Sequence, residues 1–271
     1  MQVEPFKKTI WSRYRSDGRH DLAWRKTRDP YRILVSEIML QQTQVARVAK
    51  FYPKFIKKFP DFRTLARART PVLLRTWTGL GYNRRALALQ RLSRIVLEKF
   101  NGRLPRDRAA LESLPGIGKA TAGSLRAFAF NEPEVFIETN IRRVFIHFFF
   151  PRRKTVTDRE LERYIKRTLP KKNPREWYWA LMDYGAMLGQ KGRGANPNRK
   201  SAHYRTQAQF RGSDRELRGK ILRILLKYGQ LSSVSVVKMV KEPTARVQGV
   251  MSALAREGFI EKKGTTVSIK T

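Results

Sequence analysis

Two carboxylates are the residues of this chain whose surroundings most clearly suggest chemistry. Glu37 lies within residues 33–45, whose apolar positions fit the buried face of a helix, and Glu138 lies in the turn at residues 137–140. A carboxyl group that is desolvated on such a face has a raised pKa and is suited to donating a proton. The alternative is that Glu37 is a solvated charge between two apolar residues, and periodicity alone does not decide between the two.

A glycine pair, Gly116 and Gly118, stands directly before residues 119–130, for which the sequence predicts a helix. Glycine allows a tight turn and a close approach to another molecule without a Cβ clash. The N–H groups at a helix N-terminus and the positive end of the helix dipole favour a phosphate. Gly116, Gly118 and Lys119 are therefore candidate phosphate-binding residues. An ordinary loop is the alternative, but the basic composition of the chain favours the phosphate site.

The charge of the chain indicates its partner. It has 58 Lys and Arg against 22 Asp and Glu, a formal net charge of +36 over 271 residues. Such an excess favours a polyanion and disfavours self-association, so we expect a monomer that binds nucleic acid. With no cysteine and 3 His, disulfides and thiolate-ligated zinc or iron–sulfur sites are excluded, and no metal site is expected. The sequence shows neither a long apolar helix nor a signal-peptide segment, which predicts a cytoplasmic, nucleoid-associated protein.

Helices must position these groups, and the spacing of apolar residues predicts many of them. They cover residues 4–16, 47–58, 61–69, 71–77, 84–100, 119–130, 158–169 and 175–188. The glycine-rich break at residues 78–83 is predicted to be a loop. Its aromatic residue, Tyr82, is either part of the core or a wedge that inserts into a stack of bases.

The composition changes after residue 188. Residues 189–212 are rich in Gly, Asn, Pro, Arg and Lys, and are predicted to form an irregular basic linker along phosphates. Residues 213–271 are predicted to form a winged-helix domain. Its elements are helices at 214–228, 232–240 and 243–257 and two short strands within 259–269. The third helix of such a domain reads a DNA groove; docking on a protein is the alternative, and the charge favours DNA.

Several segments together resemble the helix-hairpin-helix base-excision DNA glycosylases, and among them the A/G-specific adenine glycosylase branch. In chain order these are Trp24-Arg25, Asp29–Tyr31, Ser36–Val45, Trp77–Tyr82, Leu114–Gly123 and Leu181–Met187. Several motifs in the expected order are far more specific than any one alone. The resemblance implies an all-α, two-lobed fold over residues 1–188, with an inserted helical lobe, a DNA cleft between the lobes and a flipped nucleotide in a pocket.

The resemblance also implies roles for individual residues. Glu37 would protonate the leaving base and manage the attacking water, while Glu138 would stabilise the developing positive charge of the sugar or attack C1′. Breaking an N-glycosidic bond needs both effects. The base pocket would be bordered by Trp24, Arg25, Asn140 and Asp183. The gap in the duplex would be filled, and the opposite base touched, by Gln42, Thr43 and Tyr82.

The chain departs from the family pattern in four ways. Glu138 stands where the family has Asp, which adds one methylene. Ala120 occupies the position of the Schiff-base Lys of lyase-type relatives, which predicts a monofunctional enzyme. Residues 189–212 replace the cysteine-ligated iron–sulfur loop, and residues 213–271 replace the domain that inspects 8-oxoguanine. The resemblance therefore predicts no iron–sulfur cluster, and it allows at most a monovalent cation at the glycine hairpin.

Three functions remain open at this point. The first is an adenine glycosylase that acts on A opposite 8-oxoguanine or G, in double-stranded DNA with a mismatch or an oxidised base. The second is a thymine/uracil mismatch glycosylase, because residues 24–31 and 102–106 also look like that branch. The third is a non-catalytic protein that binds distorted DNA, and the replacement of Asp by Glu138 motivates it.

Overall fold

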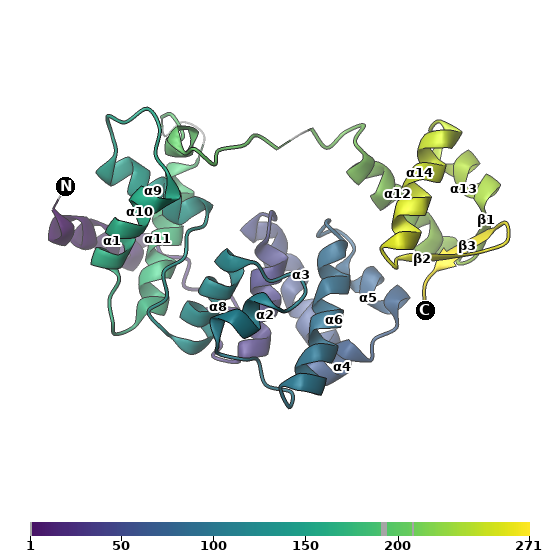
Figure 1. The fold of residues 1–271 in the computed structure, drawn as a ribbon, viewed down its shortest axis with the longest axis horizontal. Coiled ribbons are helices and arrows are strands. Elements are labelled where there is room, and N and C mark those ends of the chain that lie inside the picture. The colour runs from purple at the N-terminus through teal and green to yellow at the C-terminus, as the bar shows by residue number, and fades with distance from the viewer. Residues whose placement is uncertain (1, 191–193, 208) are drawn as a thin grey trace. The chain divides into compact units, whose positions relative to one another are not determined.

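A computed structural model describes residues 2–190, 194–207 and 209–271, and it is mainly helical (Figure 1). The chain divides into two compact units, each made of two separate stretches. The first unit comprises residues 1–37 and 104–206, and the second comprises residues 38–103 and 207–271. The second unit thus combines helices inserted into the first with the C-terminal residues, whereas the sequence analysis assigned these two parts to different domains.

The first unit is built from helices. They are α1 (Val3–Asp17), the first part of α2 (Pro30–Leu40), α7 (Arg108–Glu112), α8 (Lys119–Phe130), α9 (Thr139–Phe149), α10 (Asp158–Thr168), α11 (Pro174–Leu188) and the 3-10 helix η1 (Pro197–Lys200). Phe6 of α1 joins the main helices: its ring centroid lies 5.3 Å from that of Phe145 on α9 and 5.8 Å from that of Trp177 on α11. This aromatic packing fixes the positions of two helices. Helix α9 carries Glu138 at its N-terminal end, and helix α11 carries Asp183.

Helices α9 and α11 also approach closely at Gly185. A Cβ at this position would lie 2.3 Å from the main-chain oxygen of Asn140, which real Cβ atoms do not tolerate. Glycine is therefore needed where α11 passes the start of α9. The contact places the start of α9, with Glu138 and Asn140, directly against α11.

The second unit adds four helices of the inserted part and a C-terminal group. The inserted helices are α3 (Val45–Lys58), α4 (Phe62–Ala66), α5 (Thr70–Trp77) and α6 (Arg84–Lys99). The C-terminal group contains α12 (Asp214–Tyr228), β1 (Leu231–Ser232), α13 (Ser233–Val240), α14 (Thr244–Arg256), β2 (Ile260–Lys263) and β3 (Thr266–Ile269). Its sheet has the order β1-β3-β2 and is antiparallel, with Val267 opposite both Leu231 and Lys262.

Most predicted helices are found within a few residues of their expected bounds, and those at 119–130 and 214–228 coincide with them. Some regions differ. Helix α2 begins at Pro30 and ends at Leu40, so it does not extend to Val45; Asp29 caps it by accepting a hydrogen bond from the Tyr31 amide (2.8 Å). Helix α9, the 3-10 helix η1 and strand β1 were not predicted. No helix within the described residues is long and apolar enough to cross a membrane.

Candidate active site

Glu37 is partly buried on α2 and is held by a side chain from α8. The Ser124 hydroxyl donates a hydrogen bond to Glu37 Oε2 over 2.6 Å, and the Thr121 carbonyl lies 3.0 Å from the same hydroxyl. Burial raises the pKa of Glu37 to about 7, and the nearby charge of Glu138 adds to this, while the Ser124 hydrogen bond and Arg25 oppose it. A carboxyl group with this pKa exchanges protons readily near neutral pH.

The Ser124 hydroxyl suits both protonation states of Glu37. It donates to the carboxylate; when Glu37 is protonated, the hydroxyl instead accepts from the carboxyl group and donates to the Thr121 carbonyl. Glu37 therefore loses or gains a proton without leaving Ser124 unpaired. The sequence analysis did not identify Ser124; the only signal was a serine among the small buried residues of α8.

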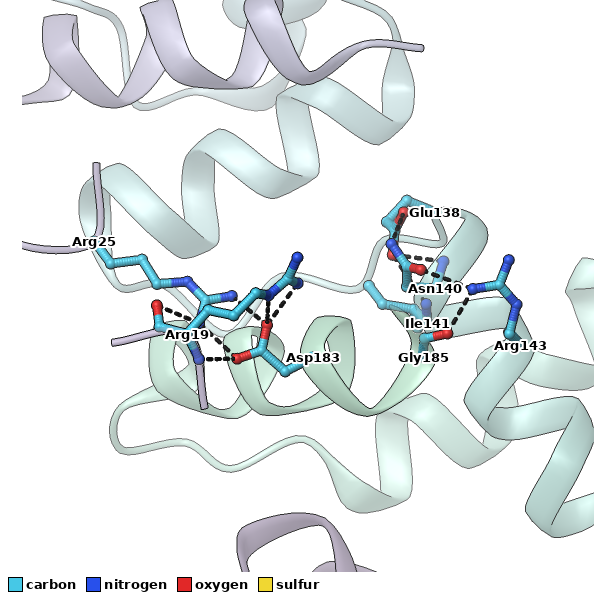
Figure 2. Close-up of polar contacts among 8 residues, drawn as sticks. All are labelled: Arg19, Arg25, Glu138, Asn140, Ile141, Arg143, Asp183 and Gly185. Carbon is cyan, nitrogen blue, oxygen red and sulfur yellow. Dashed lines mark hydrogen bonds and ion pairs between the residues drawn. The ribbon is translucent and has the colours of Figure 1, made fainter. Parts of the chain in front are cut away.

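Glu138 is the N-cap residue of α9 (Figure 2). Its Oε1 accepts from the amides of Asn140 (2.7 Å) and Ile141 (3.0 Å), and its Oε2 accepts from Asn140 Nδ2 at 3.3 Å. Burial raises the pKa of Glu138, and the two backbone hydrogen bonds together with Arg143 and Arg142 counter it only in part. The extra methylene relative to Asp is thus compatible with a capped, ordered carboxylate.

Asn140 is oriented from two sides. Its side-chain oxygen accepts from Arg143 Nη1 at 3.0 Å, and the same guanidinium nitrogen donates to the Gly185 carbonyl. Arg143 Nε donates to Asn196 Oδ1 at 3.0 Å. This directs the amide nitrogen of Asn140 towards Glu138, as Figure 2 shows. Arg143 was not identified from the sequence.

The carboxylate of Asp183 on α11 accepts hydrogen bonds from two arginines (Figure 2). Its oxygens accept from Arg25 at 2.7 and 2.8 Å, and from the side chain and amide of Arg19 at 2.6 and 2.8 Å. Burial alone would raise the pKa of Asp183, but the bonds to Arg25 and the charge of Arg19 hold it below its usual range. Asp183 therefore fixes the segment that carries Trp24 and Arg25, both of which are buried.

The glycine hairpin before α8 is exposed at Gly116, Gly118 and Lys119, while Leu114 and Ile117 anchor it in the core. Gly116 has φ +84°, a conformation that favours glycine. Gly118 is the N-cap of α8, and no atom lies within 4 Å of the position that its Cβ would take. The hairpin thus presents the start of a 12-residue helix to open space.

Three further predicted residues, Gln42, Thr43 and Tyr82, lie in the second unit on two loops that Arg85 holds together. The Arg85 guanidinium is buried and donates to the carbonyls of Ile38, Met39, Gln41, Leu80 and Gly81 and to the Thr43 hydroxyl. Burial lowers its pKa to about 10. Gln42 and Tyr82 have φ of +53° and +47°. Non-glycine residues persist in this conformation only when their surroundings impose it.

The structure thus gathers Glu37, Ser124, Glu138, Asn140 and the Arg25–Asp183 pair in the first unit, and Gln42, Thr43 and Tyr82 in the second. Among the described residues, no group of three or more His, Asp or Glu side chains is placed to hold a metal ion. Because the chain has no cysteine, no residue of 189–212 can supply thiolates to an iron–sulfur cluster.

Comparison with known proteins identifies the class. The profile of the HhH-GPD superfamily of base excision DNA repair proteins matches residues 35–171, and this chain belongs to that family. Its described fold agrees with that assignment: a thermostable thymine-DNA glycosylase superimposes with a TM-score of 0.62 at 29% identity, covering 70% of this chain and 89% of the other. An endonuclease III in complex with DNA has the same fold, with a TM-score of 0.57 at 22% identity over 72% of this chain and 89% of the other.

Two named groups of relatives are similar in sequence. An adenine DNA glycosylase of Buchnera aphidicola is 37% identical over 192 residues, which are 69% of this chain and 54% of that protein. A thymine/uracil-DNA glycosylase of Methanothermobacter thermautotrophicus is 32% identical over 68% of this chain and 84% of that protein. The chain thus spans about half the length of the adenine glycosylase relative and most of the thymine/uracil one.

Proposed function

We propose that this protein is a monofunctional DNA glycosylase that flips a mispaired base out of duplex DNA and hydrolyses its N-glycosidic bond. The proposed substrate is adenine opposite 8-oxoguanine or guanine. The observation that carries the proposal is the pair of carboxyl groups: Glu37, which has a pKa of about 7 and accepts a hydrogen bond from Ser124 of α8, and the capped Glu138, whose charge acts on Glu37. The adenine glycosylase relatives at up to 38% identity support the choice of base.

In this proposal the two acids have different tasks. Protonated Glu37 donates its proton to a ring nitrogen of the flipped base, so that the base leaves as a neutral molecule when the bond to C1′ breaks. The Glu138 carboxylate stabilises the positive charge that develops on the sugar, or bonds to C1′ transiently. Water then adds to C1′, and its proton returns to Glu37, which restores the starting state. Ser124 keeps a hydrogen bond to Glu37 throughout.

The absence of a lysine at position 120 supports the monofunctional assignment. Ala120 is exposed at the start of α8 and cannot form a Schiff base with the sugar. The strand should therefore remain intact after the base is released. Alkali should then cleave it at the abasic site.

A panel of duplexes that contain A:8-oxoG, A:G, T:G, U:G and thymine glycol tests which base is removed. Strand cleavage of each duplex is measured with and without alkali. We expect release of adenine and cleavage only after alkali. The second candidate, a thymine/uracil glycosylase, is favoured by the 84% coverage of such a relative, and release from T:G and U:G alone would establish it. No release from any duplex by a protein that binds them all would establish the non-catalytic alternative.

The start of α8 is the proposed phosphate-binding site, and Gly118→Asp tests it. Asp is a favoured N-cap residue, Gly118 has φ −101°, and its Cβ position is open, so the variant should fold with unchanged or slightly higher stability. Its carboxylate would nevertheless stand where a DNA phosphate must bind. We expect DNA affinity to fall about tenfold and the slope of log K against log salt to lose about one unit.

A matched control for Gly118→Asp adds the same charge at another helix start. Gln2 is the exposed N-cap of α1 and makes no side-chain capping bond, so Gln2→Asp should leave DNA binding unchanged. Equal loss of affinity in both variants would show that only net charge matters and would argue against a phosphate site at Gly118. Melting temperatures and binding isotherms at several salt concentrations give the comparison.

We also propose that residues 213–271 form a winged-helix domain, with α14 as the groove-reading helix. Three helices and a three-stranded antiparallel sheet in this region support it. In this division residues 1–188 form the glycosylase domain and residues 189–212 the basic linker. The net charge of +36 supports a monomer that acts on double-stranded DNA in the cytoplasm, in association with the nucleoid.

A further inference from the structure

The C-terminal group of elements, α12 to β3, is hydrogen-bonded to the inserted helices of the same compact unit. Glu257, at the end of α14, accepts paired hydrogen bonds from Arg84 at the start of α6 and from Arg218 on α12. The hydrogen bond from Arg84, together with those from Arg218, lowers the pKa of Glu257 to about 2. Arg75 on α5 adds a bond of 3.0 Å to the Leu226 carbonyl of α12.

This attachment brings Arg215 to Tyr82. Arg215 lies in the first turn of α12, and its Nη1 donates to the Tyr82 hydroxyl over 2.8 Å. Its guanidinium carbon lies 5.9 Å from the centre of the Tyr82 ring. Gln207 also contacts the Tyr82 hydroxyl, and its amide nitrogen lies 3.5 Å from the side-chain oxygen of Gln42. An aromatic ring, two amides and a guanidinium therefore meet at one place.

The loops at this place are rigid and accessible. Gln42 is exposed and Tyr82 partly so, both are in left-handed conformations, and the buried Arg85 fixes both loops. An aromatic side chain on such a loop suits insertion into a base stack. A guanidinium beside it matches the two acceptors, O6 and N7, that guanine presents on one edge. On the major-groove edge the other bases present no such pair of acceptors.

We propose that Arg215 is a specificity-determining residue that the C-terminal group supplies to the base-contacting loops. It reads the base left unpaired when the target nucleotide is flipped, and it selects guanine there. The proposal rests on the proposed function only in requiring a duplex with an extruded nucleotide. Glu257 is the positioning residue that keeps Arg215 beside Tyr82.

The test measures binding without catalysis, so that it remains informative if no base is released. The full-length protein is titrated with four duplexes that carry a tetrahydrofuran abasic analogue opposite G, A, C or T. We expect the wild type to bind the duplex with G about tenfold more tightly than the others. Arg215→Ala should reduce this preference to less than twofold. Arg223→Ala is the matched control, because Arg223 is an exposed arginine of the same helix, and it should keep the preference.

Arg84→Ala tests the attachment separately. Arg84 is exposed, so its loss should leave the melting temperature unchanged, but it removes two of the hydrogen bonds that hold Glu257 and should reduce the preference for G about threefold. Three results would overturn the proposal: a wild type without preference, an Arg215→Ala variant that retains it, and an equal loss of affinity for all four duplexes. The last result would identify Arg215 as a phosphate contact.

Discussion

Replacing Glu37 with Gln is expected to reduce the rate of base release by about 10³-fold in single-turnover experiments, while DNA binding stays within threefold. Glutamine keeps the size of the side chain and accepts the Ser124 hydrogen bond, but it has no proton to give. The wild-type rate should be highest below pH 7 and fall as the pH rises through about 7, because the reaction needs the protonated acid. A Glu37→Gln rate within tenfold of the wild type would contradict the assignment of Glu37 as the proton donor.

Two companion measurements separate this role from a structural one. The folded state of the wild type binds a proton at Glu37 between pH 4.5 and about 7 that the unfolded chain does not, so its stability falls as the pH rises through this window. Glu37→Gln does not lose stability in this pH window, because its side chain does not titrate. It should therefore be more stable than the wild type at pH 8, but not at pH 4. Ser124→Ala removes a hydrogen bond that lowers the pKa of Glu37, so its activity should persist to higher pH than that of the wild type.

The sequence predicted the parts of the site that depend on local patterns. The apolar spacing around Glu37 left open whether its carboxyl group is desolvated, and the structure shows that burial raises its pKa. The two glycines before residue 119 predicted a turn into a helix, and that turn is found. The resemblance to a glycosylase family was confirmed by the family match and the fold. The roles of the individual site residues remain predictions.

What the sequence could not supply are contacts between distant segments. Ser124 lies 87 positions from Glu37, and Arg85 lies more than 40 positions from the Gln41 carbonyl, so neither partnership follows from spacing. Helix α9 was missed even though its apolar residues Ile141, Val144 and Phe145 lie on one helical face; residues 137–140 indicate a turn, and the helix begins within that turn. Phe148 contacts Tyr184 on α11 and Phe149 contacts Tyr164 on α10, so the apolar residues at the end of α9 pack in two directions.

Replacing Glu138 with Gln is the second change with a large expected effect, a loss of about 10² to 10³ in the rate of base release. The amide oxygen still accepts from the Asn140 and Ile141 amides, so α9 stays capped and the melting temperature should change little. The negative charge near the sugar is lost. Glu138→Asp keeps the charge and is a favoured N-cap residue, so it should retain activity within about tenfold and full stability. Glu138→Ala removes both charge and cap, and should lose activity and about 1 kcal/mol of stability.

These three variants also test whether the two acids act on one another. The charge of Glu138 raises the pKa of Glu37, so removing that charge in Glu138→Gln must lower the pKa of Glu37. The residual activity of Glu138→Gln should therefore fall off at a lower pH than that of the wild type, whereas Glu138→Asp should keep the wild-type pH profile. An unchanged pH profile in Glu138→Gln would mean that the two carboxyl groups do not share a site, and a single extruded nucleoside could not then engage both.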